Sequence, residues 1–357
     1  MSRARVARRI AAGAAYGGGS IGLLGAAGVG VVLAELQLAK RSVGGGAAPV
    51  PPSGDGWYGL AYGQGHGHGH GHGRHGHGHA HGHGHAEPLR MGMLGDSTAA
   101  GQGVRRAGQT PGALLASGLS AVAERPVELR NVALPGAQSD DLDRQVTQLL
   151  SDPARVPDVC VIIVGANDVT HRMPATRSVR YLAAAVRRLR TAGAEVVVGT
   201  CPDLGTIEPV YQPLRWLARR VSRQLAAAQT IVAVEQGGRT VSLGDLLGPE
   251  FAANPRELFG PDNYHPSAEG YATAAMAVLP TLCAVLDLWP ETDHLDASRD
   301  EDMLPVAKAA SAAASRAGTE VTAARAPWAL LKHRRRRHLP AQTEATPTEP
   351  SQVPREV

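Results

Sequence analysis

Short apolar runs alternate with stretches of helical periodicity through the middle of the chain, and this alternation restricts the fold more than any other feature. Residues 159–164 are continuously apolar, as is typical of a central parallel strand that is buried on both faces. Further strands are predicted at 89–94, 127–134, 195–200 and 240–243. Helices are predicted at 110–124, 139–150, 178–191, 214–235 and 267–286, the first capped by Thr110 with Pro111 at its start. Strands that alternate with helices predict a parallel sheet covered by helices.

The two ends of the chain differ in composition from this middle part. The first 88 residues are rich in Gly, Ala and His, whereas the end of the chain is charged and rich in Ala, Thr and Pro. We therefore expect an N-terminal membrane anchor or signal segment, a Gly/His-rich linker, one folded domain and a disordered charged tail, at 1–41, 42–88, 89–290 and 291–357. For the domain we predict the α/β class, with a flavodoxin-like, doubly wound, five-stranded parallel sheet in three α/β/α layers.

The N-terminal segment is long enough to cross a membrane. Residues 10–34 carry no charge, and arginines at positions 3, 5, 8 and 9 precede them. The positive-inside rule then predicts a single-pass transmembrane helix with the domain on the extracytoplasmic side of the cell membrane. A cleaved signal peptide, which would release the protein, is the main alternative. A buried helix of a soluble domain is disfavoured, because Gly17, Gly18 and Gly19 would weaken it in water.

Alternating glycine and histidine dominate residues 65–86. The tract holds ten of the fifteen histidines of the chain, at His66, His68, His70, His72, His75, His77, His79, His81, His83 and His85. Glycine at every second position prevents a stable helix, so we expect a flexible linker. Imidazole also binds Zn, Ni or Cu, but the tract lacks the fixed spacing of a defined site. We therefore expect no required cofactor, and only loose, adventitious metal on the tract.

The net charge of +4 says less than the places where the positive charge collects. A run of four arginines stands at 334–337, and solvated tails are the simplest interpretation. Contact of residues 326–338 with an anionic bilayer is an alternative, whereas nucleic-acid binding is disfavoured because aromatic residues do not interleave with the run. The three cysteines argue against a disulfide framework, and Cys160 and Cys283 are expected to be buried. We expect a monomer.

Polar motifs follow the predicted strands, at the edge of the sheet where ligands bind in such folds. The sequence GDSTAAGQG follows the first strand, at 95–103, and NVALPGAQSDD follows the second, at 131–141. VGANDVT follows the third at 164–170, and FGPDNYHPSAEGY precedes the last helix at 259–271. Each motif alone is explained by caps and turns. Their occurrence together, in this order, predicts one shared site.

Taken together, these motifs resemble those of the SGNH hydrolase superfamily, also called the GDSL esterases and lipases. The resemblance rests on Ser97 in Gly-Asp-Ser, on Gly136, on Asn167 in Gly-Ala-Asn-Asp, and on Asp262 and His265 in Asp-x-x-His. It covers residues 89–287 and neither tail. This chain departs from the family pattern at Thr98, where the pattern has leucine, and at Pro135, which removes one N–H donor before Gly136.

The resemblance implies a serine ester hydrolase that works through an acyl-enzyme. Ser97 would be the nucleophile, His265 its general base, and Asp262 the carboxylate that orients the imidazole. The resemblance also implies an oxyanion hole formed by the N–H of Ser97, the N–H of Gly136 and the side-chain amide of Asn167. The expected substrate is a carboxylic ester, either small, acetylated or lipid. No metal is expected in this site.

Two further functions stay open from the sequence. One is a His-rich metal-binding or surface-interaction protein with a non-catalytic SGNH-like carrier domain, and the other is removal of acetyl groups from cell-envelope polysaccharide. Four more residues are candidates for a place at the site. A surface position is favoured for His171 and a turn for Asp203, whereas helix packing is favoured over an acyl pocket for Tyr211 and Trp216.

Overall fold

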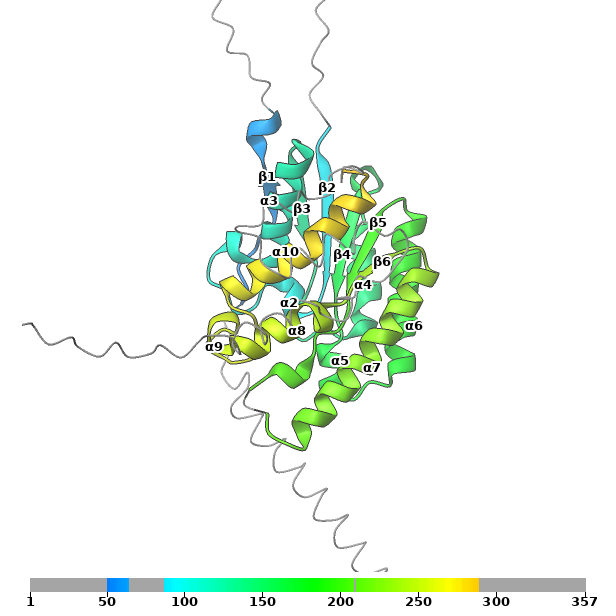
Figure 1. Cartoon of the computed structure of the whole chain (residues 1–357). Helices are drawn as coiled ribbons and strands as arrows, with labels where there is room; N and C mark the ends of the chain where they lie inside the picture. The colour runs from blue at the N-terminus through cyan, green and yellow to red at the C-terminus, as the bar shows by residue number, and fades with distance from the viewer. Residues whose placement is uncertain (1–49, 64–86, 209, 289–357) are drawn as a thin grey trace, which may run out of the picture. The chain divides into compact units, whose positions relative to one another are not determined.

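A computed structural model describes residues 50–63, 87–208 and 210–288 (Figure 1). The predicted membrane segment, the histidine tract and the predicted C-terminal tail lie outside the described residues. Among the described residues, only one helix is long and apolar enough to cross a membrane, Ala268–Val285, with a mean hydropathy of 1.3. That stretch is 56% buried inside the domain, as expected for a core helix of the fold.

Six strands form one sheet in the order β1-β3-β2-β4-β5-β6. Their bounds are β1 Gly56–Tyr58, β2 Leu89–Gly95, β3 Val127–Asn131, β4 Val159–Ile163, β5 Glu195–Gly199 and β6 Arg239–Val241. The five strands from β2 onward are parallel, and their order is that of a flavodoxin-like sheet. The predicted α/β class with a mostly parallel sheet is therefore confirmed.

The prediction of five strands, all parallel, was wrong at the N-terminal edge. β1 pairs with β3 in the antiparallel direction, with Trp57 opposite Glu128. This strand lies within residues 42–88, which are predicted to form a linker. Three residues between glycines are too short to show an alternating pattern, so the strand gives no signal in the sequence. The histidine tract consequently lies between two strands of the sheet in the sequence, β1 and β2.

Helices cover both faces of the sheet (Figure 1). In β4, Val159, Val161 and Ile163 belong to one core and Cys160 and Ile162 to the other, so the strand is buried on both faces as predicted. The first core packs against α3 Pro111–Ala123, α8 Leu243–Ala253 and α10 Ala268–Val285. The second core packs against α4 Leu142–Leu149, α6 Ala175–Thr191 and α7 Leu214–Glu235.

Several short elements at the ends of the strands were not predicted. They are α2 Ser97–Ala100, α5 Ala166–Thr170, α9 Pro255–Leu258 and the 3-10 turns η1 Leu60–Gly63, η2 Ala107–Gln109, η3 Ser139–Asp141, η4 Pro153–Arg155 and η5 Leu204–Thr206. Leu243 begins α8 instead of ending a strand. Three of them, α2, α5 and η3, lie in the polar motifs, because helix caps and turns are what those sequences form locally. The cap predicted at Thr110 is confirmed, since its side chain accepts a hydrogen bond from the Ala113 N–H.

Candidate active site

Ser97 stands at the carboxyl end of the central strand β2. The strand ends at Gly95, Asp96 caps the next helix by accepting the Thr98 N–H at 2.9 Å, and Ser97 is the first residue of α2. A Cβ atom on Gly95 would lie 1.8 Å from the carbonyl oxygen of Ile163, and Gly95 has a φ of +133°. Only glycine allows this close approach of the β2 end to the β4 backbone, so the turn from β2 into α2 fixes the direction in which Ser97 leaves the sheet.

The structure brings Ser97 and His265 together across 168 residues of sequence. The Nε2 atom of His265 lies 3.0 Å from the Oγ atom of Ser97. The Nδ1 atom of His265 lies 2.6 Å from the Oδ2 atom of Asp262. Serine, imidazole and carboxylate therefore form one continuous hydrogen-bonded chain, which is the geometry that an activated serine nucleophile requires.

Asp262 is fixed by several hydrogen bonds. Its Oδ1 atom accepts the backbone N–H groups of Tyr264 and His265, each at 3.0 Å. Burial raises the pKa of the Asp262 carboxyl, but the hydrogen bonds from the His265 side chain and these two N–H groups outweigh it, and the net pKa is lowered. The carboxyl is therefore ionised at neutral pH. An ionised Asp262 favours the His265 tautomer with the proton on Nδ1, which leaves Nε2 to accept the proton of Ser97.

A compact loop holds the imidazole in place. The N–H of Gly260 donates to the carbonyl of His265 at 2.8 Å, which closes the loop at its base. The ring of Tyr264 stands edge-on to that of His265, with 4.9 Å between the centroids. A Cβ atom on Gly103 would lie 3.1 Å from the Cβ atom of His265, so the 95–103 loop packs directly against this residue. His265 is only 7% exposed, which restricts the ring to one orientation.

Three hydrogen-bond donors of the strand-end loops have no partner among the described residues. Asn167 donates one N–H of its amide to the carbonyl of Ala137 at 3.0 Å, which orients the group and leaves the second N–H without a partner among the described residues. The backbone N–H groups of Ser97 and Gly136 likewise donate to no other residue that the structure describes. Gly136 has a φ of +82°, which favours glycine there. These are the three donors that the family resemblance implies for an oxyanion hole.

A buried carboxylate ties two of the site loops to the helix layer. Asp168 is fully buried and accepts the Ser139 N–H at 2.9 Å and the Ser178 hydroxyl at 2.7 Å. The hydroxyl of Ser139 donates to the same carboxylate. Ser139 follows Gly136 on one loop, and Asp168 follows Asn167 on the other. The two loops that carry the free donors are therefore held at a fixed separation.

Asp96, the residue before Ser97, carries an unusual pKa. Burial raises the pKa of this carboxyl to about 6, although the hydrogen bond from Thr98 and the nearby His265 lower it. At pH 7 and above the group is mostly ionised and lies close enough to His265 to interact with it.

Two buried glutamines that were not predicted from the sequence hold the strand ends in place. Gln145 accepts the N–H of Gly95 and donates to its carbonyl, both at 2.8 Å. Gln229 accepts the Cys201 N–H at 2.7 Å and donates to the Val164 carbonyl at 2.9 Å. Each side-chain amide thus forms the hydrogen bonds that the peptide group of a neighbouring strand would form, at the point where the strands separate. The sequence signal that could have identified both residues is a glutamine on the apolar side of an otherwise amphipathic helix.

We predict that Gln145 positions the nucleophile without touching substrate. Gln145→Met keeps the shape but removes both hydrogen bonds to Gly95, and should lower kcat by about 10- to 100-fold with little change in KM. In Gln145→Glu, a neutral carboxyl group can make both bonds again, so its activity relative to the native enzyme should recover as the pH falls. Steady-state kinetics from pH 5 to 9 measures both effects. Equal kcat values for the native chain and Gln145→Met would contradict this role.

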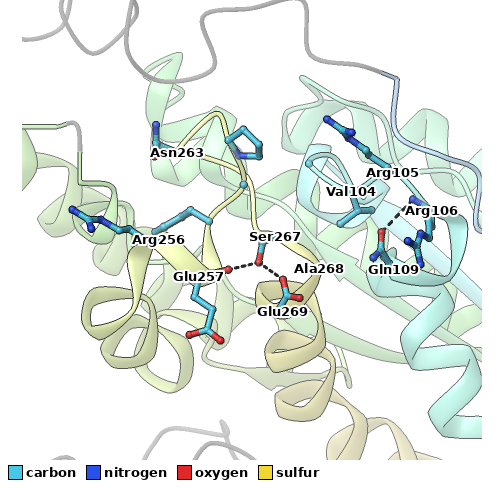
Figure 2. Close-up of a pocket in the computed structure, with 14 residues that line it drawn as sticks. Val104, Arg105, Arg106, Gln109, Arg256, Glu257, Asn263, Ser267, Ala268 and Glu269 are labelled. Atoms are coloured by element: carbon cyan, nitrogen blue, oxygen red, sulfur yellow. Dashed lines mark hydrogen bonds between the residues drawn. The ribbon is translucent and has the colours of Figure 1, made fainter.

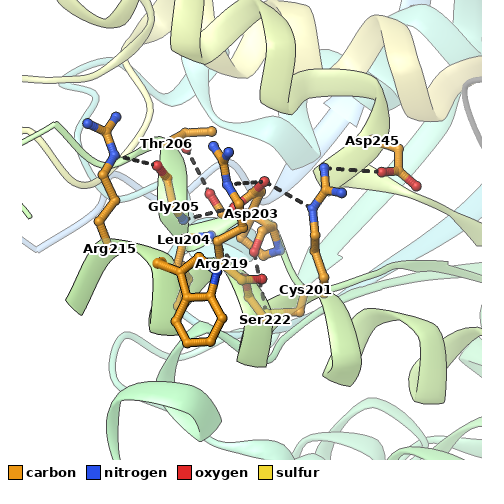
Figure 3. A network of polar contacts seen from close by, with 12 residues as sticks. Cys201, Asp203, Leu204, Gly205, Thr206, Arg215, Arg219, Ser222 and Asp245 are labelled. Carbon is orange, nitrogen blue, oxygen red and sulfur yellow. Dashed lines mark hydrogen bonds and ion pairs between the residues drawn. The ribbon is translucent and has the colours of Figure 1, made fainter. Parts of the chain in front are cut away.

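Of the other candidates, Asp203 takes part in a network of polar contacts. It is buried, and its Oδ2 atom lies 3.2 Å from Nε of Arg223 and 3.3 Å from Nε of Arg219 (Figure 3). It also caps η5, as a turn residue should. His171 is exposed, as expected, and contacts the carbonyl of Asn167.

The helix packing expected for Tyr211 and Trp216 was wrong, because their side chains are 67% and 57% exposed. Tyr211 lies just before α7 and Trp216 in its first turn, and the sequence pattern does not indicate which side of the start of this helix meets solvent. Among the described residues, no group of three or more His, Cys, Asp or Glu side chains could hold a metal ion.

Two hollows adjoin the site. One is an open groove of about 600 Å³ between residues 103–109 and 256–269, with Arg105 and Arg106 opposite Ser267 and Glu269 (Figure 2). The other is a smaller apolar cavity of about 80 Å³. Its lining includes Thr98, Ala166, Leu204, Ile207, Leu247, Gly248, Phe251, Phe259 and Tyr264. The sequence neighbours of Ser97, Asn167 and His265 therefore all border the smaller cavity.

The chain is similar to several known proteins. Residues 93–273 match the model of the GDSL-like Lipase/Acylhydrolase family. The chain is 46% identical over 185 residues to the GDSL-like esterase Rv1075c of Mycobacterium tuberculosis (strain ATCC 25618 / H37Rv). That alignment covers 51% of this chain and 58% of the relative, so the chain spans less than two thirds of the relative's length.

Solved structures also resemble the domain. The crystal structure of TesA has 24% sequence identity and a TM-score of 0.44, over 55% of this chain and 98% of that one. Axe2, an acetylxylan esterase from Geobacillus stearothermophilus, has 20% identity and a TM-score of 0.42, over 54% of this chain and 92% of that one.

Proposed function

The chain belongs to the GDSL-like lipase/acylhydrolase family, and we propose that it is a carboxylic ester hydrolase with Ser97 as its nucleophile. The observation that carries the proposal is the hydrogen-bonded chain from Ser97 through His265 to Asp262, with contacts of 3.0 and 2.6 Å. The 46% identity to a protein named as an esterase supports it. The reaction needs no cofactor, because the nucleophile, the base and the orienting carboxylate all come from the chain.

In the first half of the reaction, Ser97 Oγ attacks the ester carbonyl carbon while His265 Nε2 accepts the hydroxyl proton. The carbonyl oxygen becomes an oxyanion, which the N–H groups of Ser97 and Gly136 and the amide of Asn167 stabilise. The tetrahedral intermediate then releases the alcohol, which takes the proton from His265, and an acyl-enzyme on Ser97 remains. Asp262 stabilises the imidazolium throughout.

In the second half, water attacks the acyl-enzyme. His265 accepts a proton from this water, and the same donors stabilise the second oxyanion. The intermediate releases the carboxylic acid, and Ser97 regains its proton from His265. The products are therefore one alcohol and one acid for each water consumed.

We propose that the apolar cavity beside Ser97 receives the acyl group and limits its length. The cavity has a volume of about 80 Å³. A cavity of about 150 Å³ holds benzene, so this one accommodates on the order of three carbon atoms. Its walls are mostly aliphatic and aromatic, which suits an acyl chain and not a sugar. Esters of acetate, propionate and butyrate are therefore the proposed substrates.

Acyl-chain profiling tests this substrate range with two variants of opposite effect. Native enzyme should hydrolyse p-nitrophenyl acetate and butyrate with a kcat/KM at least ~10-fold above the octanoate, because the longer chain exceeds the cavity. Leu247→Ala enlarges the cavity and should raise the relative rate on hexanoate. Gly248→Ala narrows the cavity without strain, since the added Cβ atom would lie 3.7 Å from its nearest neighbour. In this variant kcat/KM should fall more steeply from acetate to the longer esters. Values of kcat/KM that increase from acetate to octanoate would contradict the proposed cavity.

Labelling with a fluorophosphonate probe tests the proposed activity itself. Such a probe phosphonylates only an activated serine, so mass spectrometry should find it on Ser97 in the native chain. An unlabelled but folded chain would favour the alternative of a non-catalytic carrier domain. Because the probe has a small reactive group, labelling at Ser97 combined with a flat acyl-chain profile would support the activity and reject only the cavity.

We also propose that residues 10–34 anchor the protein in the cell membrane, with the domain on the extracytoplasmic side. The support is the uncharged run that follows four arginines. Alkaline carbonate extraction of membranes tests it. A full-length chain released by carbonate would contradict the anchor, and a shortened chain in the medium would indicate a cleaved signal instead.

A further inference from the structure

The outward side of α7 exposes an unusual amount of apolar surface. Twelve large apolar side chains are exposed among the described residues, and half of them lie between residues 211 and 234. They are Tyr211 at 67%, Trp216 at 57%, Leu217 at 40%, Val221 at 36%, Ile231 at 58% and Val234 at 38%. Single exposed apolar residues need no explanation, but several of them on one side of an element indicate an interaction surface.

Helical geometry places these side chains on one stripe. At 100° per residue, Trp216, Leu217, Val221, Ile231 and Val234 fall within a sector of about 140°. The opposite side of α7 is buried against the domain through Ser222, Leu225, Gln229, Thr230 and Ala233. Five exposed apolar side chains of α7 therefore lie on its outer side, which also carries Arg220 and Gln224. The outer stripe, which we call the α7 face, has no covering element among the residues that the structure describes.

Positive charge flanks the first half of the α7 face. Residues 214–223 contain four arginines and no acidic residue. Arg219 and Arg223 contact Asp203, whereas Arg220 lies over the ring of Trp216 at 5.7 Å and Arg215 donates to the Gly205 carbonyl at 2.8 Å. Neither of the last two arginines forms an ion pair with a described residue. The aromatic end of the face therefore has a positive excess.

The same end of α7 lies next to the active site. Leu214 and Ala218 pack against a small apolar cluster that includes Ala166, beside Asn167, and Tyr264, beside His265. The exposed aromatic residues and arginines thus lie at the solvent-facing side of this end of α7, and its domain-facing side packs next to the site. A surface that binds the α7 face would come close to the route by which substrate reaches Ser97.

We propose that the α7 face docks onto an anionic lipid bilayer. A helix with tryptophan and aliphatic residues on one stripe, flanked by arginines, is the type that lies in the plane of a membrane interface. Anionic headgroups complement the excess positive charge. A symmetric contact with a second copy, centred on the arginine-rich half, would instead bring like charges together. Docking would present the site at the membrane surface, where esters of membrane-bound molecules are found.

The test follows Trp216 in the full-length chain, reconstituted into vesicles of phosphatidylcholine with and without about 30% phosphatidylglycerol. Brominated lipids quench only tryptophans that enter the interface. The chain has four tryptophans, so the quenching of Trp216 is obtained as the difference in fluorescence quenching between the native chain and Trp216→Phe. We expect strong quenching of Trp216 in anionic vesicles, several-fold less in phosphatidylcholine alone, and a loss on adding 0.5 M salt.

Leu217→Glu and Ile231→Glu place charges on the face without changing Trp216, and each should reduce its quenching several-fold. Val122→Glu is the matched control, because Val122 is a similarly exposed apolar residue on α3, at 41%, and quenching should remain. Hydrolysis of soluble p-nitrophenyl acetate should be unchanged in all three variants, which separates this inference from the proposed ester hydrolysis. Equal quenching in the native chain and both face variants would overturn the proposal. So would an unquenched Trp216 in a chain that sediments as a dimer, since a second copy would then cover the face.

Discussion

Ser97→Ala is expected to lower kcat for p-nitrophenyl acetate by on the order of 10⁶-fold, the largest effect that any single substitution in this chain should have. The variant keeps the oxyanion donors and the substrate cavity but has no atom that can form the acyl-enzyme. The activity that remains would come from water activated within the same donors. Stopped-flow release of p-nitrophenol should accordingly show no burst phase.

Folding should not change in this variant, because Ser97 forms only the hydrogen bond to His265 through its side chain. Thermal unfolding should agree with that of the native chain within a few degrees. Ser151→Ala is a suitable control, since this exposed serine follows α4 and donates only to the carbonyl of Gln148. It should retain full activity. Hydrolysis by purified Ser97→Ala at more than about one hundredth of the native rate would show that another residue is the nucleophile.

Sequence patterns were sufficient for the elements that form the core. A buried parallel strand such as 159–163 is apolar at every position, and the helices beside it repeat their apolar residues at helical spacing, so both are evident without a structure. Strand β1 could not be found in this way. Its three residues, Gly-Trp-Tyr, gain their stability from hydrogen bonds to β3, which lies about 70 residues later in the chain. Pairing between distant segments leaves no local pattern.

The residues that react were easier to predict than the residues that hold them. Ser97, Asn167 and His265 stand in motifs whose polar residues are unusual after an apolar strand. Gln145 and Gln229 stand in no such motif. A glutamine on a helix is common, and its contribution to the structure depends on which backbone groups its side chain reaches. A motif therefore identifies the chemistry, whereas the supporting hydrogen bonds depend on the tertiary packing that the structure provides.

Asn167→Ala should lower kcat by about 10²- to 10³-fold, the cost of removing one preorganised donor to an oxyanion. In the structure one N–H of the amide is bound to the Ala137 carbonyl, so the other is held in a fixed direction before substrate arrives. That bond gains strength only when negative charge develops on the substrate oxygen. The effect should therefore appear in kcat and leave KM nearly unchanged. Steady-state kinetics with p-nitrophenyl acetate measures both.

Two measurements separate a lost donor from a displaced loop in Asn167→Ala. The fluorophosphonate reaction also forms a negatively charged oxygen in the same place, so labelling of Ser97 should slow to a similar extent. Asn254→Ala is the matched control, because Asn254 is an exposed asparagine whose side chain makes no capping bond, and its kinetics should be unchanged. A variant with raised KM and native kcat would assign Asn167 to substrate binding. In that case the N–H groups of Ser97 and Gly136 would have to stabilise the oxyanion alone.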